Sequence, residues 1–507
     1  MKLNATEEAL PLPAGLATGA TSDAAPAVQR LPLAHKAGYA SGQLAELIIG
    51  SMLNMFALFY VTAVCGLPGA LAGVALGAGL VIDAILDPMI GSVSDGWKSR
   101  YGRRVPFMVA GIVPLVVTFN LMFALPSTWS VTSLFIWLTL LSITLRVSLS
   151  IFYLPYQALG AELSDDYAER SSIAAWRWGV GIFGTVAVIV LGYGVFLSGP
   201  NGVARREGYL PLTLTLTVLI VIAAAIAIRT GLVTRRLQHD TAPAATQALH
   251  RRLLGEIGEM FRNRTFLVIF GSSLLLNVAQ GIHQALALHA GLFFWGLGSE
   301  QMQMLAFAAV LGLVVAAPLV GLLVARIEKR TLLVVSLVGL AVSQASPTTL
   351  KLLGLLPLTG DALIGFLVGM AFIVGLMFAL SIIAFISIIP DAADEHEQLF
   401  HARREGLFFA GWAFASKAAT GAGLLVSGVV LQLIDFPTDA AQRGAAAMTI
   451  SERTSELLGF AGGPGAGMLA LVGTVFALFY RLDRQAHARI KSELAARQSP
   501  RAPESHA

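Results

Sequence analysis

Long apolar runs alternate with short polar turns along almost the whole chain. Each run is about twenty residues or longer, enough for an α-helix to cross roughly 30 Å of hydrocarbon. The runs are 38–64, 68–94, 106–125, 130–160, 173–198, 210–233, 265–295, 300–325, 331–354, 360–389, 405–435 and 459–481. The pattern predicts an all-α membrane protein with twelve transmembrane helices.

The composition supports this prediction and excludes other classes. Of the 507 residues, 56% are hydrophobic and 13% are charged, against about 25% charged in soluble domains. The net charge is only +4, and the basic residues lie in short turns, so the lipid bilayer and not a nucleic acid is the expected partner. The sequence contains no H-E-x-x-H, phosphate-binding loop or nucleophile elbow, so we expect no enzyme, metal site or cofactor.

Basic side chains gather in alternate turns. They are Lys98, Arg100, Arg103 and Arg104 after the second run, Arg235, Arg236, Arg251 and Arg252 after the sixth, and Arg326, Lys329 and Arg330 after the eighth. The turns after the first, third and seventh runs carry no Lys or Arg. Because basic loops remain in the cytoplasm, both termini are predicted there, with the protein in a bacterial inner membrane.

The two halves of the sequence resemble each other. Pro88 and Gly91 precede one basic turn, and Pro318 and Gly321 precede another. The acidic-basic connection 162–170 is likewise echoed by 391–405. Two repeats in the same orientation, with six helices each, are typical of the major facilitator fold. The predicted parts are a disordered cytoplasmic tail at 1–35, halves at 36–234 and 265–482, a cytoplasmic linker at 235–264 and a cytoplasmic tail at 483–507. A monomer is expected because one chain supplies both halves.

Two carboxylates lie within the second run, where nearly every neighbour is apolar. Asp83 and Asp87 are four residues apart and therefore share one face of a helix. Ionisable groups inside a membrane are costly and mark functional sites by default. Binding a proton or a sodium ion would relieve the repulsion between them. A structural ion-pair cluster is the alternative.

The turn that follows has the form G-x-x-x-D-x-x-x-x-x-x-G-R-R. Its fixed positions are Gly91, Asp95, Gly102, Arg103 and Arg104, and it resembles the loop signature of the major facilitator superfamily. Asp95 can pair with the basic residues, and the glycines permit close approach and tight turning. We expect a gating hinge here; a solvated turn is the alternative.

Three segments narrow the resemblance. They are Asp83-x-x-x-Asp87-Pro88, LPYQALGAELSDDYAERSSIAAWR (154–177) and PDAADEHEQLFHARREG (390–406) with Lys417 beyond it. Together they resemble the glycoside-pentoside-hexuronide:cation symporter family, to which the melibiose carrier belongs. The resemblance implies that Asp83, Asp87 and Ser150 bind the coupling cation and that Arg177 and Lys417 belong to the surrounding charge network.

Departures from the family pattern bear on the cation and the solute. Leu86 stands where sodium-coupled members have Asn, which favours a proton over a sodium ion because sodium needs several oxygen ligands. The sugar-binding acid of the first helix falls at Leu47, with Glu46 beside it expected to point elsewhere. The acid and tryptophan of the fourth helix fall at Tyr153 and Gln157, which the resemblance therefore implies to be substrate-cavity residues. A melibiose-like sugar is therefore not expected.

Other polar groups within the runs are candidates for the substrate cavity. Arg146 could bind a carboxylate or phosphate, or it could instead neutralise a buried aspartate. Asn277, Gln280 and Gln284 follow helical spacing and could bind hydroxyl-rich solutes or join helices. We predict a secondary active transporter that moves a small polar solute, such as a sugar, glycoside or uronate, with a cation. The alternative is an uncoupled translocator of a lysolipid or another amphipathic anion.

Overall fold

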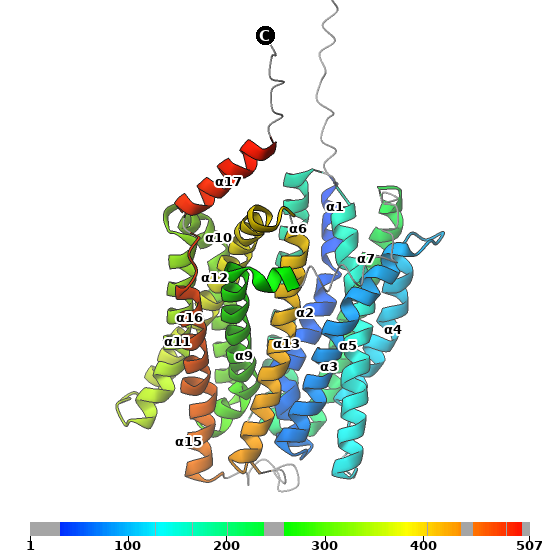
Figure 1. Ribbon diagram of the computed structural model, residues 1–507. Coiled ribbons are helices and arrows are strands. Elements are labelled where there is room, and N and C mark those ends of the chain that lie inside the picture. Colours follow the sequence, from blue (N-terminus) through cyan, green and yellow to red (C-terminus); the bar gives the residue numbers. More distant parts are fainter. Residues whose placement is uncertain are drawn as a thin grey trace, which may run out of the picture.

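The computed structural model describes residues 31–126, 128–164, 166–199, 201–237, 258–402, 404–437, 450–482 and 484–498. Within them the chain forms helices and no strand, and eleven helices are long and apolar enough to cross a membrane. The N-terminal group contains α1 (Leu33–Ala40), α2 (Gln43–Met52), α3 (Gly69–Gly96), α4 (Val105–Met122), α5 (Val131–Glu162), α6 (Tyr167–Leu191) and α7 (Tyr209–Val233). The C-terminal group contains α9 (Arg264–Phe293), α10 (Ser299–Arg326), α11 (Lys329–Leu352), α12 (Gly360–Phe400), α13 (Glu405–Leu433), α15 (Glu452–Phe460), α16 (Ala466–Leu478) and α17 (Arg484–Gln498). The all-helical membrane fold is confirmed (Figure 1).

The first predicted span is helical but alternates between α- and π-helical winding, so none of its individual segments is long enough to count among the eleven. It consists of α1, α2 and two π-helical segments, η1 (Leu53–Ala57) and η2 (Tyr60–Val64). A π-helical turn widens the helix, and such turns are frequent at functional sites. Here η1 contributes Leu53 and Asn54 to a cavity described below.

The outer surface of the bundle is apolar, as lipid requires. On α4 the side chains of Val109, Val113, Val117 and Leu121 are each about half exposed and follow one another at four-residue spacing. This spacing places them on one helix face. The stripe has the character of a surface that meets hydrocarbon and not water.

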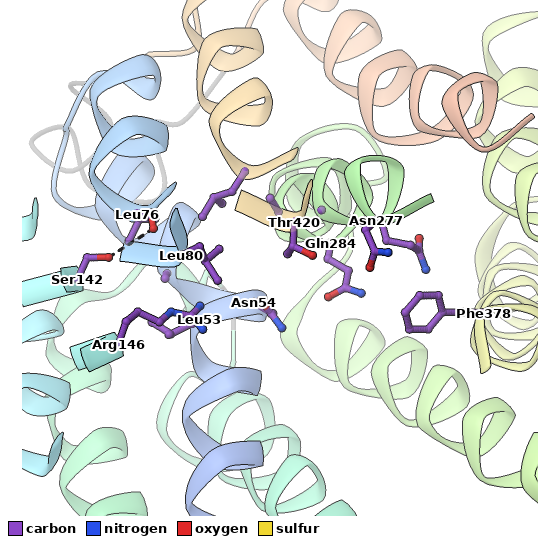
Figure 2. Close-up of a pocket in the computed structure, with 15 residues that line it drawn as sticks. Leu53, Asn54, Leu76, Leu80, Ser142, Arg146, Asn277, Gln284, Phe378 and Thr420 are labelled. Carbon is purple, nitrogen blue, oxygen red and sulfur yellow. Dashed lines mark hydrogen bonds between the residues drawn. The ribbon is translucent and has the colours of Figure 1, made fainter. Parts of the chain in front are cut away.

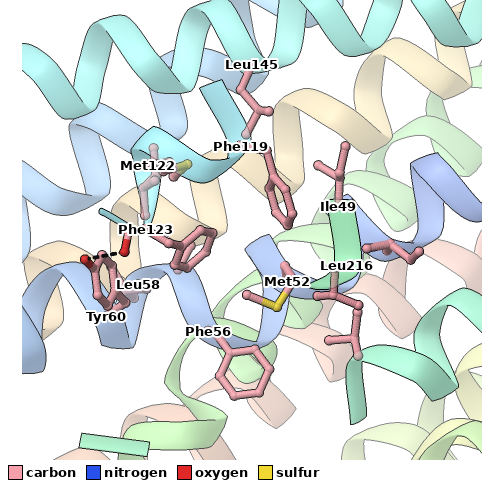
Figure 3. Close-up of a cluster of buried hydrophobic side chains, with 14 of the residues drawn as sticks. Ile49, Met52, Phe56, Leu58, Tyr60, Phe119, Met122, Phe123, Leu145 and Leu216 are labelled. Atoms are coloured by element: carbon pink, nitrogen blue, oxygen red, sulfur yellow. Dashed lines mark hydrogen bonds between the residues drawn. The ribbon is translucent and has the colours of Figure 1, made fainter. Parts of the chain in front are cut away.

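The N-terminal helices enclose a dense apolar core (Figure 3). Met52 and Phe56 of the first span, Phe119 and Phe123 of the third and Leu216 of α7 are all buried there. Phe123 also lies against the Tyr60 ring at a centroid distance of 5.2 Å. This packing holds the first span against α4 and α7.

The two groups of helices meet closely at the end of the bundle opposite α1 and α17 (Figure 1). The α3 and α13 backbones approach so closely there that a Cβ atom on Gly73 would lie 3.0 Å from the Leu425 carbonyl oxygen. Thr62 Oγ1 lies 2.9 Å from His289 Nε2, which joins the first span to α9. Ser299 of α10 donates a hydrogen bond to the Leu197 carbonyl oxygen at 2.6 Å. This end is closed.

The opposite ends of α3 and α13 are not packed in this way. A Cβ atom on Gly91 or Gly96 would meet nothing within 4 Å among the described atoms. The close approach of α3 and α13 is therefore found at the end of the bundle opposite α1 and α17, whereas Gly91 and Gly96 near the other end of α3 have open space beside them.

The predicted N-terminal tail and linker lie largely outside the described residues, as does part of the C-terminal tail. This holds for 1–30 of the N-terminal tail, 238–257 of the linker, and 483 and 499–507 of the C-terminal tail. Within the C-terminal tail, residues 484–498 form α17, which packs on α12.

Candidate functional site

A compact ionic cluster joins the two groups of helices. Asp83 and Asp87 project from α3, Ser150 from α5 and Lys417 from α13. The Lys417 Nζ atom lies 3.0 Å from Asp83 Oδ2 and also contacts Asp87 Oδ2. The aspartate side chains are 5% and 18% exposed. The structure thus brings together all three predicted cation-coupling residues and one residue of the predicted charge network.

Ser150 makes the cluster suited to hold one proton. Its Oγ atom is within hydrogen-bonding distance of Asp83 Oδ1 and lies 2.7 Å from Asp87 Oδ1. A hydroxyl has a single hydrogen to donate, but it can also accept. Both contacts are satisfied when one carboxyl is protonated and donates to Ser150 while Ser150 donates to the other carboxylate.

Arg146 and Arg177 are arranged differently from Lys417. Neither forms an ion pair within 4.0 Å of an acid among the described residues, although Arg146 lies close enough to Asp83, Asp87 and Glu46 for their charges to act on it. The Arg177 guanidinium lies 6.0 Å from the centroid of the Trp178 ring. Lys417, and not Arg146, directly neutralises the aspartate pair.

Next to the cluster, a cavity of about 250 Å³ lies between the two groups of helices (Figure 2). The predicted residues Arg146, Asn277, Gln280 and Gln284 line it, and Arg146 is the one charged side chain among its described lining residues. Leu80, one helical turn before Asp83, also lines it. The cavity and the ionic cluster are therefore next to each other along α3.

A second, larger cavity of about 560 Å³ adjoins the first. The two share Asn54, Gln280, Gln284 and Phe378. The larger one is bounded mainly by apolar side chains, such as Trp295 of the α9–α10 turn, and no Lys, Arg, Asp or Glu is found among its described lining residues. Both volumes are of the order of known small-molecule sites, roughly 300–1,000 Å³.

The predicted amides differ in how far the protein already satisfies them. Asn277 donates to the Ser273 carbonyl oxygen at 2.7 Å, and Gln344 of α11 donates to Gln280. Gln284 is exposed and has no hydrogen-bond partner among the described residues. Gln284 is thus the predicted amide best placed to bind a solute.

Tyr153 and Gln157 lie outside both cavities. Tyr153 packs on Tyr156, with ring centroids 6.0 Å apart, and Gln157 is exposed. Two polar residues that sequence reasoning did not select lie closer to the site: Asn54, which lines both cavities, and Glu46. Both could have been selected from the sequence, because each is a polar residue inside the first apolar run.

The predicted gating loop forms a network within the N-terminal group. Arg104 pairs with Asp95 at 2.5 Å and with Glu162 at 2.7 Å, and Arg103 reaches the same Glu162 oxygen at 3.3 Å. Gly102 has φ = 91°, a conformation that favours glycine. Gly91 has open space around it.

The C-terminal group contains the equivalent contact. Lys329 of the repeated basic turn lies 2.7 Å from Asp391, just as Arg104 lies 2.7 Å from Glu162. In each group, the basic turn between the second and third helices pairs with the acidic end of the fourth. The repeat read from the sequence therefore corresponds to repeated ion pairs.

A two-group helical bundle with a charged cluster and cavities between the groups defines a membrane transporter. The sequence profile of the MFS/sugar transport protein family matches residues 38–484, and the chain belongs to this family of the major facilitator superfamily.

Relatives support the same class. An uncharacterized symporter of Synechocystis sp. is 24% identical over 93% of this chain and 98% of its own length. The glucuronide carrier protein homolog of Escherichia coli is 30% identical over 32% of this chain and 35% of its own. Sodium-dependent lysophosphatidylcholine symporter 1 of Xenopus tropicalis is 30% identical over 31% of this chain and 30% of its own length.

The fold has solved counterparts. The inward-open structure of the xylose transporter XylE from Escherichia coli superimposes with a TM-score of 0.57 at 12% identity, over 91% of this chain and 98% of that one. Family membership and the relatives, together with this fold, make the chain a multi-pass membrane transporter of the symporter type, and not an enzyme.

Proposed function

We propose that this protein accumulates a small organic solute by proton symport. In this proposal the Asp83–Asp87 pair is the proton-binding site. The observation that carries the proposal is the ionic cluster across the two groups of helices: two carboxylates and a hydroxyl from one group facing an ammonium from the other.

The ligand arrangement favours a proton over a sodium ion. One oxygen of each carboxylate faces Ser150, and the other faces Lys417. A sodium ion requires several oxygens at once and would have to displace the Lys417 ammonium. A proton needs one oxygen only and fits the arrangement as it stands.

The same cluster links binding to movement. Protonation weakens the attraction of the aspartate pair for Lys417, which belongs to the other group. A ligand that changes this attraction shifts the balance between states with different ends open. In the orientation predicted from the basic loops, the present structure is the inward-facing state.

The test is uptake into liposomes that contain a pH dye and the purified protein. Solutes are offered as panels of sugars, uronates and other organic acids, with and without sodium. We expect a solute to drive proton entry in the wild type and not in Asp87→Asn. Asp361→Asn, which changes an exposed acid at the start of α12, is the matched control and should retain entry. Undiminished uphill uptake by Asp87→Asn would refute the proposal, and sodium-dependent uptake without proton movement would assign the site to sodium.

One observation favours a second candidate. The larger cavity is bounded mainly by apolar side chains, which suits the tail of a lysolipid more than a free sugar. In that case fluorescent lysolipid would cross proteoliposome leaflets without a proton gradient, while no water-soluble solute would be accumulated.

A further inference from the structure

The smaller cavity presents a guanidinium that the protein leaves available. Arg146 extends from α5 toward Leu53 and Asn54 (Figure 2). Among the described residues its guanidinium makes no hydrogen bond and no ion pair within 4.0 Å. Its five N–H donors are arranged in a planar fork that matches a carboxylate or a phosphate. A side chain needed only for charge neutralisation would contact the acid it neutralises.

The acids near Arg146 already have other partners. Lys417 contacts both Asp83 and Asp87. Glu46, whose charge also acts on Arg146, accepts a hydrogen bond from Gln43 Nε2 at 2.8 Å. None of these contacts occupies the Arg146 fork.

Two amides complete this part of the cavity. Asn54 and Gln284 lie where the smaller cavity joins the larger one, since both line each of them. Both are exposed to this space, and neither has a hydrogen-bond partner among the described residues. An amide can donate to an acidic oxygen or bind a hydroxyl next to it.

Beyond these amides the surroundings change character. Trp295, Met302, Leu305 and Val310 line the larger cavity. A polar solute would leave these side chains poorly matched, whereas an apolar group would be removed from water there.

We infer that Arg146, with Asn54 and Gln284, binds the acidic group of the transported solute and that the larger cavity receives an apolar group of the same molecule. The inference deepens the proposed function and rests on it for the direction of transport. It names the substrate class as an amphipathic organic monoanion, whether water-soluble or a lipid with an anionic head group.

Binding to the purified protein in detergent tests this without requiring coupled transport. The probes are 4-nitrophenyl β-D-glucuronide, the neutral 4-nitrophenyl β-D-glucoside with the same apolar group, and D-glucuronate with the acid alone. The wild type should bind the first more tightly than either of the others. A second set of probes consists of two lysolipids, the anionic lysophosphatidylglycerol and the zwitterionic lysophosphatidylcholine. If the anionic glycoside binds more tightly than lysophosphatidylglycerol, the solute is water-soluble; if lysophosphatidylglycerol binds more tightly, the solute is a lipid.

The variants separate the two parts of the site. Arg146→Gln should weaken binding of the anionic aryl glycoside by roughly 10- to 100-fold, the effect of losing a charged hydrogen-bonding partner, and leave the neutral glycoside nearly unchanged. Arg146→Lys should weaken binding of the anionic aryl glycoside less than Arg146→Gln does, because lysine keeps the charge although it lacks the planar fork. Ala306→Phe, which fills the larger cavity, should weaken the aryl probes and spare D-glucuronate. Thr144→Val, an exposed change on the same helix, is the control.

The outcomes distinguish this inference from the proposed function. Equal binding of charged and neutral aryl probes, unchanged binding in Arg146→Gln when that variant remains monodisperse, or no binding of any probe overturns the inference. Charge-dependent binding together with no proton-coupled uptake would leave the inference standing and reject the proposed function.

Discussion

The contact of Lys417 with both aspartates leads to a quantitative prediction. Lys417→Met removes the ammonium and leaves Asp83 and Asp87 facing each other. At 3.0 Å, two unit charges attract by about 5 kcal/mol if the effective dielectric constant is near 20. Desolvation offsets much of this, and the Lys417 side chain is 37% exposed, which screens it further. We expect a net loss of about 2 kcal/mol in the free energy of unfolding.

A double-mutant cycle isolates the interaction. Asp83→Asn in the Lys417→Met background removes the repulsion left by the first change. The two together should therefore cost about 1–2 kcal/mol less than the sum of the single changes. The measurement is denaturant unfolding of the purified protein in detergent, followed by tryptophan fluorescence at one pH.

A second cycle provides the control. Lys351 donates to the Phe294 carbonyl oxygen and lies over the rings of Phe294 and Trp295, so it has no contact with Asp83. Lys351→Met and Asp83→Asn should be additive within about 0.5 kcal/mol. If the Lys417 cycle is equally additive, the ion pair does not contribute as argued and the reasoning is refuted.

Three further predictions concern the hydroxyl, the closed end and the loop. Ser150→Ala should raise the proton concentration for half-maximal uptake about tenfold, the effect of losing one hydrogen bond. Ser150→Thr keeps the hydroxyl and should leave this concentration unchanged. An unchanged pH profile in Ser150→Ala would count against a role of Ser150 in binding the proton. Gly428→Leu should prevent the close approach of α3 and α13. An impermeant maleimide added from outside should then label Cys65, the sole cysteine, more than in the wild type. Equal labelling would contradict the assignment of the closed end. Arg104→Gln should lower the free energy of unfolding by about 2–3 kcal/mol, because Glu162 loses a nearly buried partner; unchanged denaturant stability would exclude that role.

Much of this arrangement could be predicted because membranes impose strong local rules. A helix in lipid must satisfy its own backbone, so apolar runs alone indicated the spans and the all-helical class. Asp83 and Asp87 were identifiable because an acid inside such a run is costly and marks a functional site by default. The repeated basic turns likewise indicated two similar groups of helices.

Other features depend on contacts between distant segments. The sequence left open whether Arg146 neutralises the aspartates, and only the arrangement of α13 against α3 gives that role to Lys417. Glu46 was expected to point away from the site, because its position beside Leu47 on the helix was the only information available. The sequence could not show that Arg146 of α5 lies near it. The π-helical turns of the first span have no signal in the sequence, because the local composition there remains that of an ordinary apolar helix.

Because Ser150 can donate to one carboxylate while it accepts from the other, the Asp83–Asp87 pair is suited to take up a single proton in each cycle. If the solute brings one negative charge to Arg146, the loaded protein gains no net charge. A complete cycle would then carry no net charge, so the transmembrane voltage would not contribute to accumulation, whereas with a neutral solute it would contribute about 2.3 kcal/mol per 100 mV. Accumulation would follow the pH difference across the membrane and persist in a depolarised cell.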